Sequence, residues 1–218
     1  MTAQDKIEIL NEKLLGFNKK FKIIYQDSPY KYADQALAGN RGSGCKYDTL
    51  TIEEIKQIKI KEIADENCFL FFWATWPLIR EAFEIIDAYN FDYKTIAFLW
   101  IKRNATGTIF KSMGSYTRAN SEPLLLATRG KPKVITHRLS QIIETQEPEI
   151  IETVYKHIHS KKPDIFRQRI TQLCGNISRI ETFGRTLIND WTVIGNDEKL
   201  QLQPLEQFNE TKTALYQN

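Results

Sequence analysis

The segment Lys22-Ile23-Ile24-Tyr25-Gln26-Asp27-Ser28-Pro29-Tyr30 joins a short apolar stretch to a turn signal. Lys22 to Gln26 carries consecutive apolar residues rather than an alternating pattern, and Asp27-Ser28-Pro29 ends it, which predicts a buried strand. Open parallel sheets bind ligands at the carboxyl ends of their strands, so Asp27 to Tyr30 is a candidate ligand site. For so short a motif, an ordinary turn without function is the alternative.

The rest of the chain alternates apolar strands with helices. A glycine-rich loop is expected from Ala33 to Cys45, and Thr51 with Glu54 forms the pattern of a capping box that begins a helix. Further strands are expected at 69–74, 95–101, 123–128, 179–183 and 191–194, and further helices begin near Pro77 and Pro163. This order predicts an α/β fold with a mainly parallel sheet covered on both faces. We expect one domain over residues 1–197 and a polar tail over residues 198–218.

Composition indicates a globular protein without a membrane span. The 218 residues are 42% hydrophobic and 26% charged, and the apolar run that begins at Phe69 is too short to cross a bilayer. No basic and apolar N-terminal stretch resembles a signal peptide, so a cytoplasmic protein is expected. Cys45, Cys68 and Cys174 are far apart, which favours reduced structural thiols. His157 and His159 lack nearby ligand partners, and we expect no bound metal.

The positive charges are concentrated in the middle of the chain. The formal net charge is only +3, but eight lysines and arginines lie between positions 94 and 137, where the only acid is Glu122. Such a one-signed segment indicates a polyanionic partner, and a solvated surface is the alternative. We expect the part from Lys102 to Lys133 to face a nucleic acid.

The residue types of the tetrapeptide suit methylation of an exocyclic adenine amine. That nitrogen is a poor nucleophile because its lone pair is delocalised into the ring. A carboxylate and a carbonyl that accept its two N–H bonds would make it more nucleophilic, and an aromatic ring would hold the base in line. Asp27 can supply the carboxylate, Ser28 the carbonyl and Tyr30 the ring, with Pro29 shaping the turn.

An ordered set of further motifs resembles the MTA-seventy-type adenine methyltransferases, the family of the catalytic subunit that methylates adenosine in mRNA. That family has Asp-Pro-Pro-Trp after a strand, where this chain has Asp27-Ser28-Pro29-Tyr30. The other matching segments run from about Ile23 to Asn196 in the family's order: Tyr47 to Ile55, Phe69 to Trp73, Trp100-Ile101-Lys102, Gly114 to Glu122, His159 to Asp164, Glu181 to Arg185 and Trp191 to Asn196.

The resemblance implies a Rossmann-like methyltransferase fold that uses S-adenosylmethionine. Its motif order is circularly permuted, because the catalytic motif precedes the cofactor-binding strand. By resemblance, Asp27 and Lys162 would hold the amino and carboxylate ends of the cofactor's methionine. The ribose and adenine of the cofactor would contact Arg185, Asn189 and Asn196. The nucleic-acid contacts would be Tyr47, Lys102, Arg103, Lys111, Tyr116, Arg118, Asn120 and Glu122.

Ser28 and Tyr30 depart from the family's Pro and Trp. A serine keeps the backbone carbonyl but loosens the turn, and a tyrosine still stacks. The loop from Ala33 to Tyr47 is expected to close over a flipped or single-stranded base. A short chain without an appended RNA-binding module favours a DNA methylase of a bacterium, phage or mobile element. An RNA methyltransferase and a decayed, non-catalytic nucleic-acid-binding subunit are the alternatives, and both a homodimer and a heterodimer are left open.

Overall fold

The chain folds around strand β1, Phe21–Gln26, which has neighbours on both sides in a seven-stranded sheet. The computed structural model describes residues 2–31, 49–104, 106–111, 116–146, 162–184 and 187–195. The other elements are α1 (Ala3–Gly16), α2 (Ile52–Lys56), α3 (Ile60–Ile63), β2 (Ala64–Trp73), η2 (Trp76–Leu78), α4 (Ile79–Ala88), β3 (Asp92–Arg103), β4 (Ser121–Arg129), β5 (Ile142–Gln146), α5 (Ile165–Cys174), β6 (Arg179–Thr182) and β7 (Thr192–Ile194).

The order of the strands is β5-β3-β4-β2-β1-β6-β7. Strand β1 is parallel to β2 and β6, with Ile24 opposite Leu70 on one side and Ile180 on the other. Strand β4 is antiparallel to both of its neighbours, β2 and β3, while β3–β5 and β6–β7 are parallel pairs. The described sheet is therefore mostly parallel, with β4 alone reversed, and this agrees with the predicted Rossmann-like methyltransferase fold.

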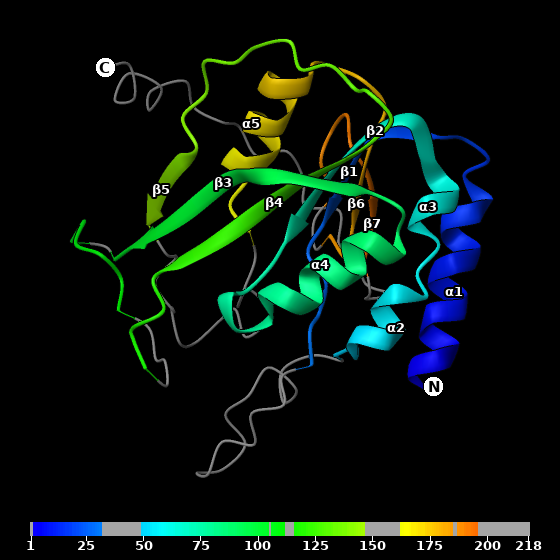
Figure 1. Ribbon diagram of the computed structural model, residues 1–218, viewed down its shortest axis with the longest axis horizontal. Helices are drawn as coiled ribbons and strands as arrows, with labels where there is room; N and C mark the ends of the chain where they lie inside the picture. The colour runs from blue at the N-terminus through cyan, green and yellow to red at the C-terminus, as the bar shows by residue number, and fades with distance from the viewer. Residues whose placement is uncertain are drawn as a thin grey trace.

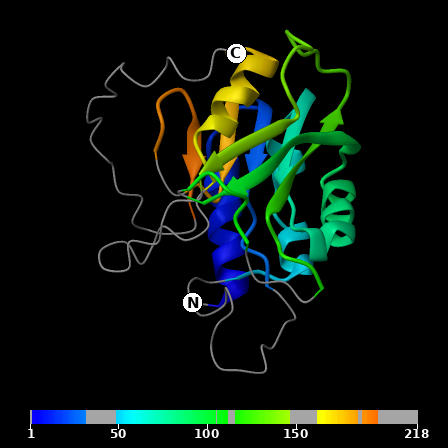
Figure 2. The same ribbon diagram turned by 90° about the vertical axis from the view of Figure 1, so that its left-hand side faces the viewer.

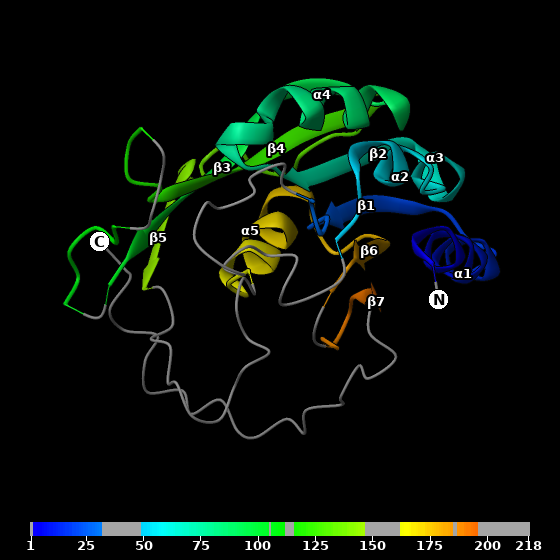
Figure 3. The ribbon, with the colours of Figure 1, turned by 90° about the horizontal axis from the view of Figure 1, so that it is seen from below.

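Helices cover the sheet on both faces (Figure 1), and two apolar clusters hold the layers together. Figures 2 and 3 show α4 and α5 on opposite faces of the sheet. Successive residues of β1 divide between the clusters: Ile24 packs toward α1 to α4, and Tyr25 packs with the cluster that includes Phe166 of α5. Burial on both faces explains why β1 has no alternating polar pattern.

Local signals in the sequence predicted most of these elements. The capping box before α2 is confirmed, because Thr51 N donates to Glu54 Oε2 at 2.7 Å and Glu54 N donates to Thr51 Oγ1 at 3.3 Å. The predicted strands correspond to β1, β2, β3, β4, β6 and β7, and Pro77 lies in the 3₁₀ turn before α4. Helices α1 and α3 and strand β5 were not anticipated.

The expected buried thiols are present at two of the three positions. Cys68 and Cys174 are free and buried, and burial raises the pKa of each thiol to about 12. Both therefore remain protonated and unreactive near neutral pH. Cys45, His157, His159 and the expected loop at 33–47 lie outside the described residues. Within the described ranges, no helix is long and apolar enough to span a bilayer.

Candidate active site

The segment Asp27 to Tyr30 follows β1 at the carboxyl edge of the sheet, between the ends of β2 and β6. Backbone hydrogen bonds fix the far end of this turn to Leu50. Leu50 N donates to Pro29 O at 2.7 Å, and Lys31 N donates to Leu50 O at 2.9 Å. The strand and the segment before α2 therefore hold the turn from both ends.

Tyr30 anchors the turn to β2. Its hydroxyl donates to the carbonyl oxygen of Trp73 at 3.0 Å, and its ring packs edge-on against Phe72 with centroids 6.3 Å apart. The side chain is only 5% exposed. The predicted stacking of Tyr30 on a base stays a prediction, because the ring lies within the core in the structure described here.

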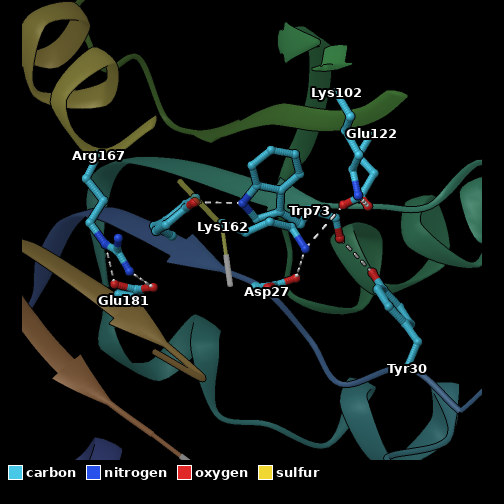
Figure 4. Close-up of polar contacts among 9 residues, drawn as sticks. Asp27, Tyr30, Trp73, Lys102, Glu122, Lys162, Arg167 and Glu181 are labelled. Atoms are coloured by element: carbon cyan, nitrogen blue, oxygen red, sulfur yellow. Dashed lines mark hydrogen bonds and ion pairs between the residues drawn. The ribbon is translucent and has the colours of Figure 1, made fainter. Parts of the chain in front are cut away.

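Alternating charges form a chain that begins at Asp27 (Figure 4). Lys162 Nζ lies 3.0 Å from Asp27 Oδ1 and 3.2 Å from Glu122 Oε2, and Lys102 Nζ lies 2.6 Å from Glu122 Oε1. The four residues come from the end of β1, the approach to α5, and strands β4 and β3. Two of the residues assigned to the cofactor, Asp27 and Lys162, are thus brought together from positions far apart in the chain.

Lys162, in the middle of this charge chain, is nearly closed to solvent. The Lys162 side chain is 8% exposed and its Nζ lies 5.1 Å from the centroid of the Trp73 ring, whereas the Asp27 side chain is 24% exposed. Lys102 Nζ lies 4.4 Å from the centroid of the Trp100 ring. The ring faces of Trp73 and Trp100 stabilise the two lysine side chains. Within the pair formed by Asp27 and Lys162, Asp27 is the more exposed member.

The charge chain also determines the protonation states of Lys162 and Glu122. Burial alone would lower the pKa of Lys162, but Asp27 and Glu122 outweigh burial and raise the pKa above its usual value. Burial would raise the pKa of Glu122, but Lys162 and Lys102 together lower it to about 2. At neutral pH Lys162 is therefore an ammonium and Glu122 a carboxylate.

A second buried ion pair joins α5 to β6. Arg167 of α5 donates from Nε and Nη2 to the two carboxylate oxygens of Glu181 at 2.7 and 2.6 Å, and its Nη1 contacts Asp164 at 2.5 Å. Burial raises the pKa of Glu181, and the bidentate arginine opposes that shift. The pair lies near the carboxyl end of β6, where Gly184 approaches Val193 so closely that an added Cβ would lie 2.4 Å from its Cγ1.

The family model for MT-A70 matches residues 21–197, which include every strand and all of the charge chain. The chain belongs to the MT-A70 family. It is 26% identical to the type II methyltransferase M.MunI of a Mycoplasma species over 213 residues, covering 89% of this chain and 86% of the relative. It is 25% identical to the human N(6)-adenine-specific methyltransferase METTL4 over 201 residues, covering 90% of this chain but 41% of that longer protein.

MT-A70 membership makes the basic segment a candidate for nucleic-acid contact, but two of its cations are paired. Lys102 is bound to Glu122, and Arg103 donates to the Glu144 carboxylate at 2.8 and 2.9 Å. Glu122 pairs with Lys102 and Lys162, and among the described residues no ion pair or hydrogen bond joins Glu122 to Arg118. Three other members of the predicted set are exposed: Lys111, Tyr116 and Arg118.

Strand β4 divides the segment 102–133 between two edges of the sheet. Because β4 is antiparallel to β3, Arg118 and Asn120 lie beside the carboxyl end of β3, and Asn120 O accepts from Lys102 N at 2.9 Å. Arg129, Lys131 and Lys133 follow at the opposite edge, where Arg129 donates to Lys61 O. The whole segment therefore does not form one continuous surface.

The remaining predicted cofactor and substrate contacts are only partly described. Asn189 lies exposed in the turn that leads to β7, while Tyr47, Arg185 and Asn196 lie outside the described residues. Gln26 and Trp73 also lie at the site, and neither was predicted to do so from the sequence. Gln26 could have been noticed as an uncharged polar residue at the end of a mostly apolar strand, whereas the position of Trp73 beneath Lys162 depends on strand pairing. Among the described residues, no group of three or more His, Cys, Asp or Glu side chains could hold a metal ion.

Proposed function

We propose that this MT-A70 protein transfers a methyl group from S-adenosylmethionine to the exocyclic 6-amino group of adenine in DNA. The observation that carries the proposal is the pair of Asp27 and Lys162, 3.0 Å apart at the carboxyl edge of the sheet, with the Ser28 carbonyl next in the chain. Ligands of open α/β sheets bind at this edge, and here the edge presents the acceptors that an adenine amine requires.

The charges of the pair fit the amino-acid end of S-adenosylmethionine. The methionine moiety is a zwitterion, with an ammonium that a carboxylate attracts and a carboxylate that an ammonium attracts. Asp27 would hold the first and Lys162 the second, because a compact lysine ammonium suits a carboxylate. Asp27 and Glu122 together raise the pKa of Lys162 and keep it charged in the absence of that ligand.

Asp27 and Ser28 can also hold the amine of the substrate. Asp27 Oδ1 faces Lys162, and we assign the second oxygen of the carboxylate to one N–H of the amine. The Ser28 carbonyl accepts Tyr30 N at 3.0 Å, and a carbonyl oxygen has a second lone pair that can take the other N–H. Two acceptors fixed in this way withdraw the amine's lone pair from conjugation and raise its nucleophilicity.

S-adenosylmethionine, when bound, supplies an electrophilic methyl group. Asp27 orients the amine toward it and stabilises the positive charge that develops on the nitrogen during transfer. The extra proton of the methylated amine then leaves through the Asp27 carboxylate to solvent, because the Asp27 side chain is partly exposed. The buried lysine holds its ligand without taking part in proton transfer.

Lys111, Tyr116 and Arg118 support a polynucleotide substrate. They are exposed in the connection between β3 and β4, which starts and ends at the same edge of the sheet as Asp27. We assign DNA rather than RNA because M.MunI, the relative matched over 86% of its own length, is a type II methyltransferase that acts on DNA. The longer METTL4 carries the name of an adenine N(6) enzyme, which supports the choice of base.

Purified protein tests the proposal in two steps. Calorimetry with S-adenosylmethionine should show binding that Lys162→Met weakens by about 1–3 kcal/mol, the cost of leaving a charged group unpaired. Transfer of a tritium-labelled methyl group from S-adenosylmethionine should be faster to DNA oligonucleotides than to matched RNA oligonucleotides. Asp27→Ala should abolish this methyl transfer. Absence of S-adenosylmethionine binding together with absence of transfer to either polymer would support the decayed subunit instead. Transfer to RNA alone would reverse the choice of substrate.

A further inference from the structure

Gln26 is a buried polar residue whose amide contacts the catalytic turn. Its Nε2 donates to Ser28 Oγ at 2.8 Å and to the Tyr89 hydroxyl at 3.1 Å, and Tyr89 in turn donates to Ile55 O at 2.7 Å. Gln26, Ser28 and Tyr89 are each 5% exposed or less. A hydrogen-bonded path therefore runs from the turn, across one face of the sheet, to the segment at the end of α2.

Stability alone does not explain a glutamine at this position. Its Oε1 is buried and has no hydrogen-bond partner within the described residues. A buried acceptor without a partner destabilises the fold, so an apolar residue would serve the core better. The hydrogen bonds to Ser28 and to the Tyr89 hydroxyl offset part of that cost, and the bond to Ser28 links the glutamine to the turn after β1.

That contact can fix the direction of the Ser28 carbonyl. Pro29 confines the preceding residue to extended backbone conformations, which restricts rotation at Ser28. Serine itself leaves φ free, because φ is locked only in proline. A hydrogen bond on Oγ holds the Cβ of Ser28 in place, and this removes the rotation that would swing the carbonyl. The carbonyl accepts Tyr30 N at 3.0 Å.

We propose that Gln26 is a positioning residue, which holds Ser28 so that its carbonyl faces the substrate amine. The inference rests on the proposed function, because it uses the Ser28 carbonyl as an acceptor for the amine. It adds a residue that touches neither the cofactor nor the substrate. A proline at position 28 would fix φ by itself and make the amide of Gln26 dispensable.

A double-mutant cycle in the full chain tests this role. Gln26→Leu and Ser28→Ala should each lower kcat by about 10- to 100-fold, the range expected for a misplaced reacting group, while the Kd for S-adenosylmethionine stays within about twofold. The two changes together should cost no more than either one. In the Ser28→Pro background, Gln26→Leu should change kcat by less than about threefold. Thermal melting of each variant identifies any loss of fold, and Ser28→Ala, which removes only Oγ, remains a test if Gln26→Leu fails to fold.

Hydrogen exchange at the Tyr30 amide separates this inference from the proposed function. That amide reports on the Ser28 carbonyl whether or not the protein is active, and Gln26→Leu and Ser28→Ala should each accelerate its exchange about tenfold or more. Faster exchange in a protein without methyltransferase activity would overturn the proposed function but retain the positioning role. The inference is overturned if Gln26→Leu keeps both the kcat and the Tyr30 amide exchange rate of the wild-type protein. It is also overturned if Gln26→Leu lowers kcat equally in the wild-type and Ser28→Pro backgrounds.

Discussion

Replacing Lys162 with methionine removes the central cation of the charge chain. Lys162 and Lys102 together lower the pKa of Glu122 from 4.5 to about 2, and a shift of that size corresponds to about 3 kcal/mol of stability at neutral pH. Lys102 remains 2.6 Å from Glu122 in the variant, so only part of this stabilisation is lost. Asp27 also loses its partner at 3.0 Å. We expect the free energy of unfolding to fall by about 2 kcal/mol.

Urea denaturation at pH 7 measures this loss, with Lys133→Met as the control because Lys133 is exposed. The control should stay within about 0.5 kcal/mol of wild type, as most surface substitutions do. An acid with a depressed pKa contributes stability that is present above its unfolded pKa and lost as the pH falls through its folded pKa. The deficit of Lys162→Met should therefore narrow below about pH 4. A loss of stability under about 0.5 kcal/mol at pH 7, or one that grows as the pH falls, would refute the stabilising role of Lys162 between Asp27 and Glu122.

Three further outcomes test other parts of the structure. Lys111→Ala should lower the slope of log affinity for DNA against log salt by about one unit, whereas Lys102→Ala should leave that slope unchanged because Lys102 is already paired. Gly130→Ala should unfold at lower urea concentration than Gly107→Ala. Both glycines have positive φ, but only at Gly130 would an added Cβ lie 2.2 Å from a backbone oxygen. We expect the free energy of unfolding to fall by more than about 2 kcal/mol for Gly130→Ala and by about 1 kcal/mol for Gly107→Ala. Arg167→Met should lower the free energy of unfolding by about 3–5 kcal/mol, because it leaves a buried carboxylate unpaired.

Local patterns in the sequence were sufficient for most of the elements. A run of apolar residues and a proline turn predicted β1 and the candidate site at its end, and the capping box at Thr51 predicted the start of α2. Helix α1 carries a similar signal, since Thr2 and Asp5 form a capping box and its buried residues Ile7, Leu10 and Leu14 recur at helical spacing. These two signals together are sufficient to predict that helix.

Strand direction and charge pairing were not accessible in the same way. An apolar run such as that of β4 does not indicate which way the strand runs, and its reversal separates Arg118 from Arg129 across the sheet. The partners of Lys102 and Arg103 depend on which strands become neighbours, so both residues were predicted to contact phosphates. The approach of Lys162 to Asp27 was anticipated only through the resemblance, because 134 residues lie between them.

Mass spectrometry of nucleosides tests the central claim most directly. DNA and RNA from matched cells that express the wild-type chain, Asp27→Ala or no protein would be digested and assayed for N(6)-methyladenine. The wild-type chain should raise the amount of this modified base in DNA. With Asp27→Ala the amount should equal that in cells without the protein, although the variant accumulates as a folded protein. Equal N(6)-methyladenine in DNA from cells that express the wild-type chain and Asp27→Ala would contradict the assignment of Asp27 as the acceptor that methylation requires.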